Sequence, residues 1–159
     1  MNNGSNSDFR TVRGYQLANQ HEGQLTPAME DYLEMTYRLC TENGYTRVGK
    51  LSELLHVKPP SASKMISKLA NLGYLKYDRY EIIRLTEDGF KIGEYLLKRH
   101  ETIEEFLTLI GSLNSLEETE LIEHYVSAST ISNLNNLIEF LKSDEVERRY
   151  NELKKNAEL

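Results

Sequence analysis

The sequence predicts a mainly α-helical protein: an N-terminal winged helix-turn-helix with a small β-hairpin wing, followed by an α-helical domain. Apolar residues recur at helical spacing over most of the chain beyond residue 24. A short helical stretch, a proline-containing break and a second helix precede two strand-like runs. Residues 45–79 hold seven basic and two acidic residues, whereas residues 80–159 hold nine basic and seventeen acidic ones. This asymmetry is typical of a DNA-binding module joined to a different module.

The predicted domains follow from these shifts in composition. Residues 1–24 are polar and form a flexible tail, 25–89 form the winged-helix domain, and 90–159 form the helical domain. No apolar run approaches the roughly 20 residues that span a bilayer, and no signal peptide begins the chain, so we expect a cytoplasmic protein without membrane contact. The single cysteine, Cys40, excludes an intrachain disulfide and is expected to be a buried core thiol.

The first expected helix begins at Pro27, with Thr26 as its N-cap, and ends before Gly44. A short helix is expected over 48–55, followed by a break over 57–60. The helix that would enter DNA is expected over 61–72, and strands over 74–77 and 81–85 form the hairpin. Thr86, Glu87 and Asp88 cap a long helix over about 90–110, although Gly89 and Gly93 weaken its first turns. Further helices are expected over about 116–127, 130–142 and 145–155.

The second helix of the helix-turn-helix carries the candidate DNA contacts. Its N-terminus offers free N–H groups for phosphate oxygens, and Lys64 lies one turn further, where a side chain can reach base edges. Arg79 at the hairpin tip can contact the DNA backbone or the minor groove. A solvated surface is the ordinary alternative for each lysine taken alone. The predicted DNA-binding residues are Lys58, Pro60, Ser61, Ser63, Lys64, Lys68 and Arg79.

A candidate metal site begins with Glu120-Leu-Ile-Glu123-His124. Read as a helix, its three polar residues share one face. Carboxylates together with imidazole favour manganese, iron or zinc over magnesium or calcium. Asp31, Glu34 and His100 have the right chemistry to complete such a site. Each also has an ordinary interpretation: an acid that complements the helix dipole, a solvated glutamate and a half-buried histidine.

The chain from Thr26 to about Lys142 resembles the diphtheria toxin repressor family, and within it most closely the manganese transport regulator branch. The resemblance occurs in order over roughly three quarters of the chain. The matching stretches are Thr26-Pro-Ala-Met-Glu-Asp-Tyr-Leu-Glu34, Gly44-Tyr-Thr-Arg-Val48, Pro60-Ser-Ala-Ser-Lys-Met-Ile-Ser-Lys-Leu69, Leu85-Thr-Glu-Asp-Gly-Phe-Lys-Ile-Gly93, Lys98-Arg-His100 and Glu120-Leu-Ile-Glu-His124.

The resemblance implies a Mn(II)-activated transcriptional repressor of manganese-uptake genes, not an enzyme. It implies a binuclear Mn(II) site, hence two ions per subunit, with Fe(II), Zn(II), Co(II) or Cd(II) as substitutes. Its ligands would be Asp31, Glu34, His100, Glu120, Glu123 and His124. The iron-responsive branch typically has a methionine in place of Asp31 and a cysteine in place of Glu120. The Pro59-Pro60 pair and the N-terminal extension depart from the branch pattern.

The expected partners are a second copy of the chain and double-stranded operator DNA. The apolar content of the later helices exceeds what a small winged helix needs, so we expect a homodimer that reads a palindromic site. The carboxylates would repel one another without metal and leave the modules loosely coupled. Two alternatives remain: the same fold responding to iron or another divalent metal, and a metalloenzyme that uses Glu120, Glu123 and His124. An organic ligand would leave the carboxylates unexplained.

Overall fold

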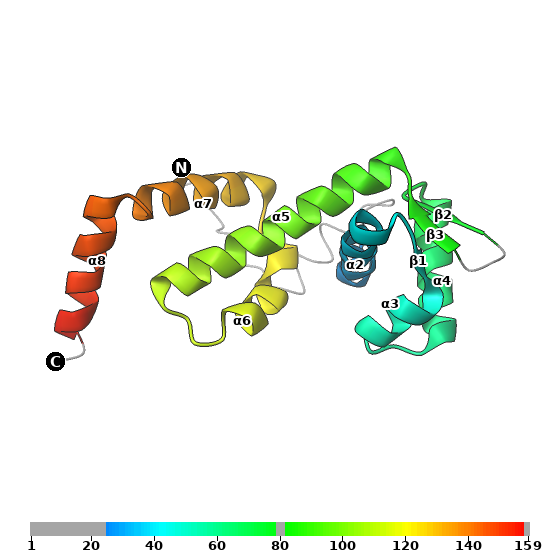
Figure 1. Cartoon of the computed structure of the whole chain (residues 1–159), viewed down its shortest axis with the longest axis horizontal. Helices are drawn as coiled ribbons and strands as arrows, with labels where there is room; N and C mark the ends of the chain where they lie inside the picture. The colour runs from blue at the N-terminus through cyan, green and yellow to red at the C-terminus, as the bar shows by residue number, and fades with distance from the viewer. Residues whose placement is uncertain (1–24, 79–81, 158–159) are drawn as a thin grey trace, which may run out of the picture.

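The computed structural model describes residues 25–78 and 82–157. It confirms the predicted class, a helical N-terminal unit with a small antiparallel sheet followed by a helical domain. The long helix α5 runs from the N-terminal unit to the helices of the second domain (Figure 1). The predicted tail and Arg79 lie outside the described residues.

The first helix, α2 (Pro27–Asn43), has the predicted boundaries. The Thr26 hydroxyl accepts a hydrogen bond from the Met29 N–H at 3.3 Å, which satisfies a free donor of the first turn. Gly44 ends the helix in the left-handed conformation at φ 76°, where a Cβ is disfavoured. Cys40 is half-buried rather than fully buried, and burial raises the pKa of its thiol.

The helix-turn-helix consists of α3 (Val48–Leu54) and α4 (Pro59–Asn71). Helix α4 begins at Pro59 and not at Ser61, so the break is shorter than the sequence suggested. The proline pair fits the first turn of the helix. The N–H groups of that turn have no partner inside a helix, so proline loses no hydrogen bond there by lacking an N–H. His56, in the connection, has a positive φ of 51°, a conformation that few residues other than glycine adopt.

The sheet contains a strand that the sequence did not predict. Among the described residues, β1 (Thr46–Arg47) joins β2 (Leu75–Tyr77) and β3 (Ile82–Leu85) in the antiparallel order β1-β3-β2. Thr46 pairs with Ile83, and Leu75 pairs with Leu85. The wing is therefore bonded through β3 to the segment that leads into α3.

One core unites the N-terminal unit with the start of α5 (Glu87–Ile110). It combines residues from all its helices and from the sheet, chiefly Leu33, Leu51, Ile66, Leu69, Ile83 and Leu96. Helix α5 begins at Glu87, before the predicted position, with the Thr86 hydroxyl accepting from the Gly89 N–H at 3.0 Å. A Cβ at Gly89 would lie 1.9 Å from the Tyr74 carbonyl oxygen. This glycine lets the helix approach the backbone closely, which outweighs its low helix propensity.

The second domain continues with α6 (Ser115–Ile122), the 3-10 turn η1 (Glu123–Tyr125), α7 (Ala128–Leu141) and α8 (Asp144–Ala157). The single helix predicted over 116–127 is thus wrong: the α-helix ends at Ile122, and Glu123 and His124 lie in the tighter turn. Helix α5 contacts both α6 and α7. In the described part of the chain, no helix is long and apolar enough to cross a membrane.

Candidate metal centre

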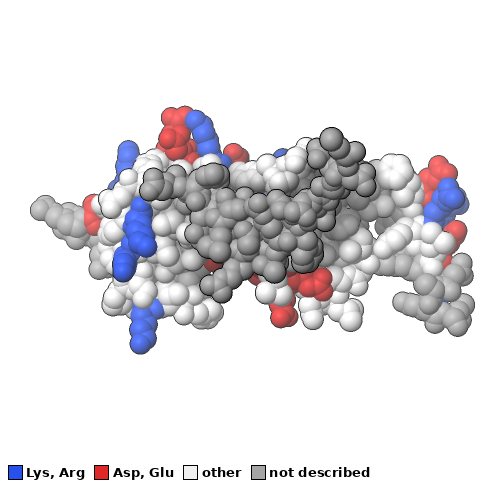
Figure 2. All heavy atoms as spheres, turned by 180° about the vertical axis from the view of Figure 1, so that it is seen from behind, with Lys and Arg blue, Asp and Glu red and all other residues white. Residues whose placement is uncertain are grey.

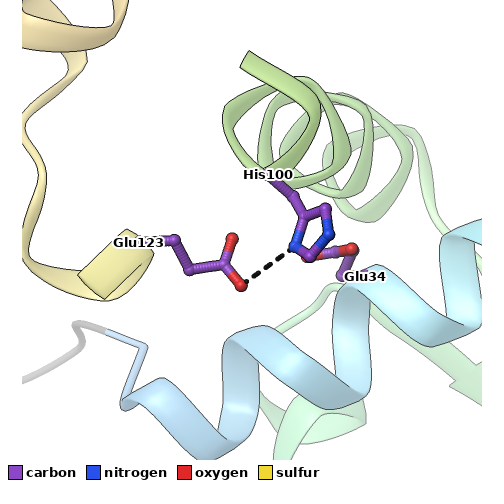
Figure 3. A group of neighbouring side chains, drawn as sticks. All are labelled: Glu34, His100 and Glu123. Carbon is purple, nitrogen blue, oxygen red and sulfur yellow. Dashed lines mark hydrogen bonds and ion pairs between the residues drawn. The ribbon is translucent and has the colours of Figure 1, made fainter. Parts of the chain in front are cut away.

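A cluster of possible metal ligands lies where α2, α5 and η1 meet. Glu34 on α2, His100 on α5 and Glu123 in η1 point toward one another (Figure 3), and their ligand atoms all lie within 4.8 Å of one another. His100 Nδ1 is 3.2 Å from Glu123 Oε1. His100 and Glu123 are buried, so the cluster is held inside the protein. The hydrogen bond to Glu123 raises the pKa of His100 despite the opposing effect of burial.

His124 and Asp31 form an adjoining pair. His124 Nε2 lies 3.0 Å from Asp31 Oδ1, and His124 Nδ1 lies 2.7 Å from Glu30 Oε2. The hydrogen bonds to Asp31 and Glu30 raise the pKa of His124 to about 9. Burial alone would raise the pKa of Glu30, but its bonds to His124 and Arg99 lower it overall.

Glu120, the sixth predicted ligand, lies at the rim of the cluster. Its side chain is 58% exposed, and Oε1 is 3.8 Å from His100 Nδ1. Burial, followed by the charge of Glu123, raises the pKa of Glu120. The structure thus brings all six predicted residues into one region, although Glu120 and Glu123 do not belong to one regular α-helix.

Arginine side chains balance the carboxylates. Arg38 binds Glu34 at 2.7 Å. Arg99 is buried and binds Glu30 at 2.9 Å through Nη2. The expected mutual repulsion of bare carboxylates is therefore offset by these cations and by the histidines. Neither Glu30 nor Arg99 was among the residues predicted for the site. Glu30 and Arg99 directly precede the predicted ligands Asp31 and His100 in the chain, and this adjacency was the signal that could have identified them.

The cluster fits a divalent transition metal. Glu123 Oε2 is buried and lies 3.6 Å from Arg99 Nε, which is too long for a hydrogen bond. Within residues 25–78 and 82–157, neither atom has a hydrogen-bond partner. A buried carboxylate oxygen without a partner is costly, and a cation would satisfy it. Mixed carboxylate and imidazole ligands suit manganese, iron or zinc.

The candidate DNA contacts lie apart from this cluster, at the start of α4. Lys58, Pro60, Ser61, Lys64 and Lys68 are exposed. Ser63 is half-buried, and its hydroxyl lies 3.2 Å from the Tyr77 hydroxyl on β2, which links α4 to the wing. Figure 2 shows lysine and arginine side chains gathered at the end of the molecule that holds α4 and the sheet.

Large apolar side chains are exposed on the second domain. They extend from the end of α5 through α7, and they include Leu113, Leu116, Leu121, Tyr125, Leu137 and Phe140. Large exposed apolar side chains of this kind are candidates for a protein–protein interface.

Comparison with known proteins assigns both domains. Residues 24–90 match the model of the iron dependent repressor N-terminal DNA binding domain. Residues 86–149 match that of the iron dependent repressor metal binding and dimerisation domain. The HTH-type transcriptional regulator MntR of Oceanobacillus iheyensis is 43% identical over 132 residues, which cover 82% of this chain and 88% of that protein.

Solved structures agree in fold. The manganese regulator SloR is 29% identical with a TM-score of 0.61, and the match covers 73% of this chain and 55% of that one. ScaR with bound Zn²⁺ is 32% identical with a TM-score of 0.59, and the match covers 72% of this chain and 55% of that one. The chain thus spans just over half the length of these two proteins. The resemblance inferred from sequence is confirmed: this chain belongs to the iron-dependent repressor family of transcriptional regulators, with a DNA-binding domain followed by a metal-binding and dimerisation domain.

Proposed function

We propose that the protein is a Mn(II)-activated repressor of manganese-uptake genes, which acts in the cytoplasm and binds palindromic operator DNA as a homodimer. The observation that carries this proposal is the meeting of Glu34 with His100 and Glu123. Glu34 lies on α2, whose residues share a core with α4. The other two lie on elements of the second domain. A metal held by all three would tie the DNA-binding unit to the second domain.

The proposed ligands are Asp31, Glu34, His100, Glu120, Glu123 and His124, which suffice for two Mn(II) ions per subunit. Carboxylates at positions 31 and 120 are hard ligands, which suit Mn(II). The bound ions would supply positive charge among these carboxylates. A relative at 43% identity is named a MntR regulator, and a structural neighbour is described as a manganese regulator, which supports this metal.

Control of DNA binding follows from where the chain places these residues. Asp31 and Glu34 lie on α2, which contacts both α4 and α5. A rigid α2–α5 contact sets the direction in which α4 projects from the dimer. If one α2–α5 arrangement holds metal better and also fits the operator, metal shifts the population toward it. A coupling of about 1–3 kcal/mol corresponds to a roughly 5–150-fold gain in operator affinity.

The DNA contacts are proposed to come from the N-terminus of α4. Its first N–H groups, with Ser61, would bind phosphate, while Lys64 would reach the major groove. Lys58, Pro60, Ser63, Lys68 and Arg79 complete the proposed contact set. The exposed apolar residues of the second domain would form the dimer interface and fix the spacing of the two α4 helices.

Operator binding with and without metal tests this function. A gel shift on the gene's own promoter would be run in Mn(II) and again in excess chelator, with a scrambled DNA of equal length as control. We expect tight binding to the promoter in Mn(II) alone. Equal affinity in both conditions would rule out the mechanism, though not the fold.

A second candidate is the same fold responding to another divalent metal. A structural neighbour, ScaR, has been solved with Zn²⁺ and with Cd²⁺ bound and is also described as a manganese-activated repressor, so the metal that occupies such a centre need not be the activating one. The order of intrinsic affinities also prevents any carboxylate and imidazole site from selecting Mn(II) by strength alone. The gel shift repeated with Fe(II), Zn(II), Co(II) and Cd(II) decides between the two. The metalloenzyme alternative is excluded by membership in a family of transcriptional regulators.

A further inference from the structure

Glu30 and Arg99 lie against the proposed metal ligands without belonging to the set. Glu30 precedes Asp31 on α2, and Arg99 precedes His100 on α5. A single carboxylate oxygen, Glu30 Oε2, lies 2.7 Å from His124 Nδ1 and 2.9 Å from Arg99 Nη2. The three side chains join the helix of the DNA-binding domain to α5 and η1.

The 2.7 Å contact fixes where a proton lies on the His124 ring. Glu30 and the ring nitrogen would repel each other at this distance if neither carried a hydrogen, so Nδ1 must donate. Arg99 has only donors, and it shares the same acceptor oxygen. Its 3.2 Å separation from His124 Nδ1 is therefore the distance between two donors on one carboxylate.

The opposite ring nitrogen faces the proposed ligands. His124 Nε2 lies 3.0 Å from Asp31 Oδ1. A metal-binding imidazole commonly donates its other N–H to a carboxylate, which fixes the ring orientation and makes the ligating nitrogen more basic. In the metal-free protein Nε2 also donates a hydrogen bond, to Asp31, and a metal bound there would replace that proton and leave Glu30 as the carboxylate that holds Nδ1–H.

Arg99 in turn limits how Glu30 can move. Its side chain is 4% exposed, and besides Glu30 it lies beside Glu123, with Nε 3.6 Å from Glu123 Oε2. Arg99 therefore orients Glu30 through a hydrogen bond from Nη2, whereas it attracts Glu123 by charge alone, across a distance longer than a hydrogen bond. Arg99 thus contacts two carboxylates of the centre: Glu123, a proposed ligand, and Glu30, which holds the proposed ligand His124.

We propose that Glu30 and Arg99 are positioning residues of the metal centre: Glu30 holds Nδ1–H of His124 so that Nε2 is the nitrogen that binds metal, and Arg99 holds Glu30 by a hydrogen bond and attracts Glu123 by its charge. This inference rests on the proposed function, because it assigns a role toward the same ions. It predicts that neither residue binds metal, yet that both control metal affinity.

Three variants test the inference: Glu30→Ala removes the acceptor, Glu30→Gln keeps an oxygen acceptor without charge, and Arg99→Lys keeps charge without the fork. Glu42→Ala, at an exposed position of the same helix, is the matched control. Mn(II) affinity of the full chain would be measured by competition with a chromophoric chelator. We expect Glu30→Ala to lose about 10–100-fold, the range found when such supporting groups are removed. Glu30→Gln and Arg99→Lys should lose less, and the control should match the unaltered protein.

A second readout separates positioning from general support of the fold. Nitrogen-15 NMR of the Zn(II)-loaded protein reports which ring nitrogen of His124 binds the metal, with His124→Gln used to assign the signals. Nε2 should bind in the unaltered protein, with a proton on Nδ1, and this pattern should be lost or mixed in Glu30→Ala. Metal-free thermal melts of each variant establish that it is folded.

Two results would overturn the inference. Unchanged Mn(II) affinity in Glu30→Ala is one. The other is a loss of affinity that follows a loss of metal-free stability while Nε2 coordination persists, which would mean a structural role. Neither result affects the proposed function, which instead fails if the unaltered protein binds its operator equally with and without Mn(II).

Discussion

Gly93 on α5 and Tyr37 on α2 are packed so closely that no side chain fits at position 93. A Cβ at Gly93 would lie 2.6 Å from the Cβ of Tyr37. The Tyr37 ring also meets the Phe90 ring edge to face, with centroids 5.0 Å apart. This contact fixes the separation of the two helices two turns away from His100. It is therefore a point at which the packing of α2 on α5 can be tested without changing a proposed metal ligand.

Gly93→Ala should destabilise the protein by about 1–3 kcal/mol, the cost of overpacking a close contact. Urea unfolding of the chelated protein measures this directly. Gly49→Ala is the matched control, because no atom lies within 4 Å of a Cβ there, in the short helix α3. Alanine should raise stability by up to about 1 kcal/mol at that position. Equal effects at both positions would contradict the close packing of α2 on α5.

Glu120→Ala should abolish the metal response and leave the protein folded. The Glu120 side chain is more than half exposed at the rim of the cluster, so its loss leaves no cavity in the core. Mn(II) at 100 times its dissociation constant should stabilise the unaltered protein by about 2.7 kcal/mol, and the variant by much less. Thermal melts with Mn(II) and with chelator measure both. A variant stabilised as strongly as the unaltered protein would remove Glu120 from the ligand set. Glu118→Ala, at an exposed position of α6, is the control.

The metal-free protein should lose stability as pH rises from about 6.5 to above 9. Hydrogen bonds to Asp31 and Glu30 raise the pKa of His124 to about 9 in the folded state, from 6.5 in the unfolded chain. The folded state thus holds this proton more tightly. The stabilisation of the folded state by protonated His124 is fully present below pH 6.5 and is lost as pH passes through 9. Its size is on the order of 3 kcal/mol at most, at about 1.4 kcal/mol per pKa unit.

Urea unfolding of the chelated protein at several pH values checks this, with His124→Gln as the reference that cannot titrate. The two proteins should differ most below pH 6.5, and the difference should shrink toward pH 9.5. A constant difference across this range would show that His124 has no raised pKa.

Lys64→Gln should weaken operator binding and reduce its salt dependence. If Lys64 contacts phosphate, the slope of log affinity against log salt should fall by about 1 and all sequences should be affected alike. If it reads a base edge, the loss should be about 1–3 kcal/mol and should depend on the base at one position. Lys91→Gln on α5, where Lys91 pairs with Glu87, is the control. Unchanged binding in Lys64→Gln would remove this residue from the interface.

Most of the fold was predictable because its elements carry local signals. Thr26, Pro27 and Gly44 mark both ends of α2, and apolar spacing marks the rest. Strand β1 was missed because Thr46 and Arg47 are too few to form a pattern, and their pairing with β3 is a long-range contact. The early start of α5 was missed because its glycines looked like helix breakers. The close approach to Tyr74, which makes a glycine necessary at position 89, is visible only in three dimensions.

Six candidate ligands follow from the sequence, and their assignment as metal ligands stays a prediction. Ligand chemistry and the family resemblance point to all six side chains, and the structure brings them together. The helical spacing of Glu120, Glu123 and His124 suggested one continuous helix, whereas the chain tightens into a 3-10 turn after Ile122. Glu30 and Arg99 were missed because a first-turn acid and a basic residue on a helix have common alternative explanations. Their shared contact joins residues 69 positions apart in the sequence.

The proposed metal centre takes residues from both α2 and the second domain, and this would limit how the protein can be divided or recombined. Its DNA-binding part, cut after β3, would keep Asp31 and Glu34 but lose the buried histidine and Glu123. Exchanging the second domain for that of a relative would preserve metal sensing only if the new domain fitted this α2. With the proposed ligands, a change in α2 would have to be matched by a change in the second domain, although the two belong to separate units of the chain.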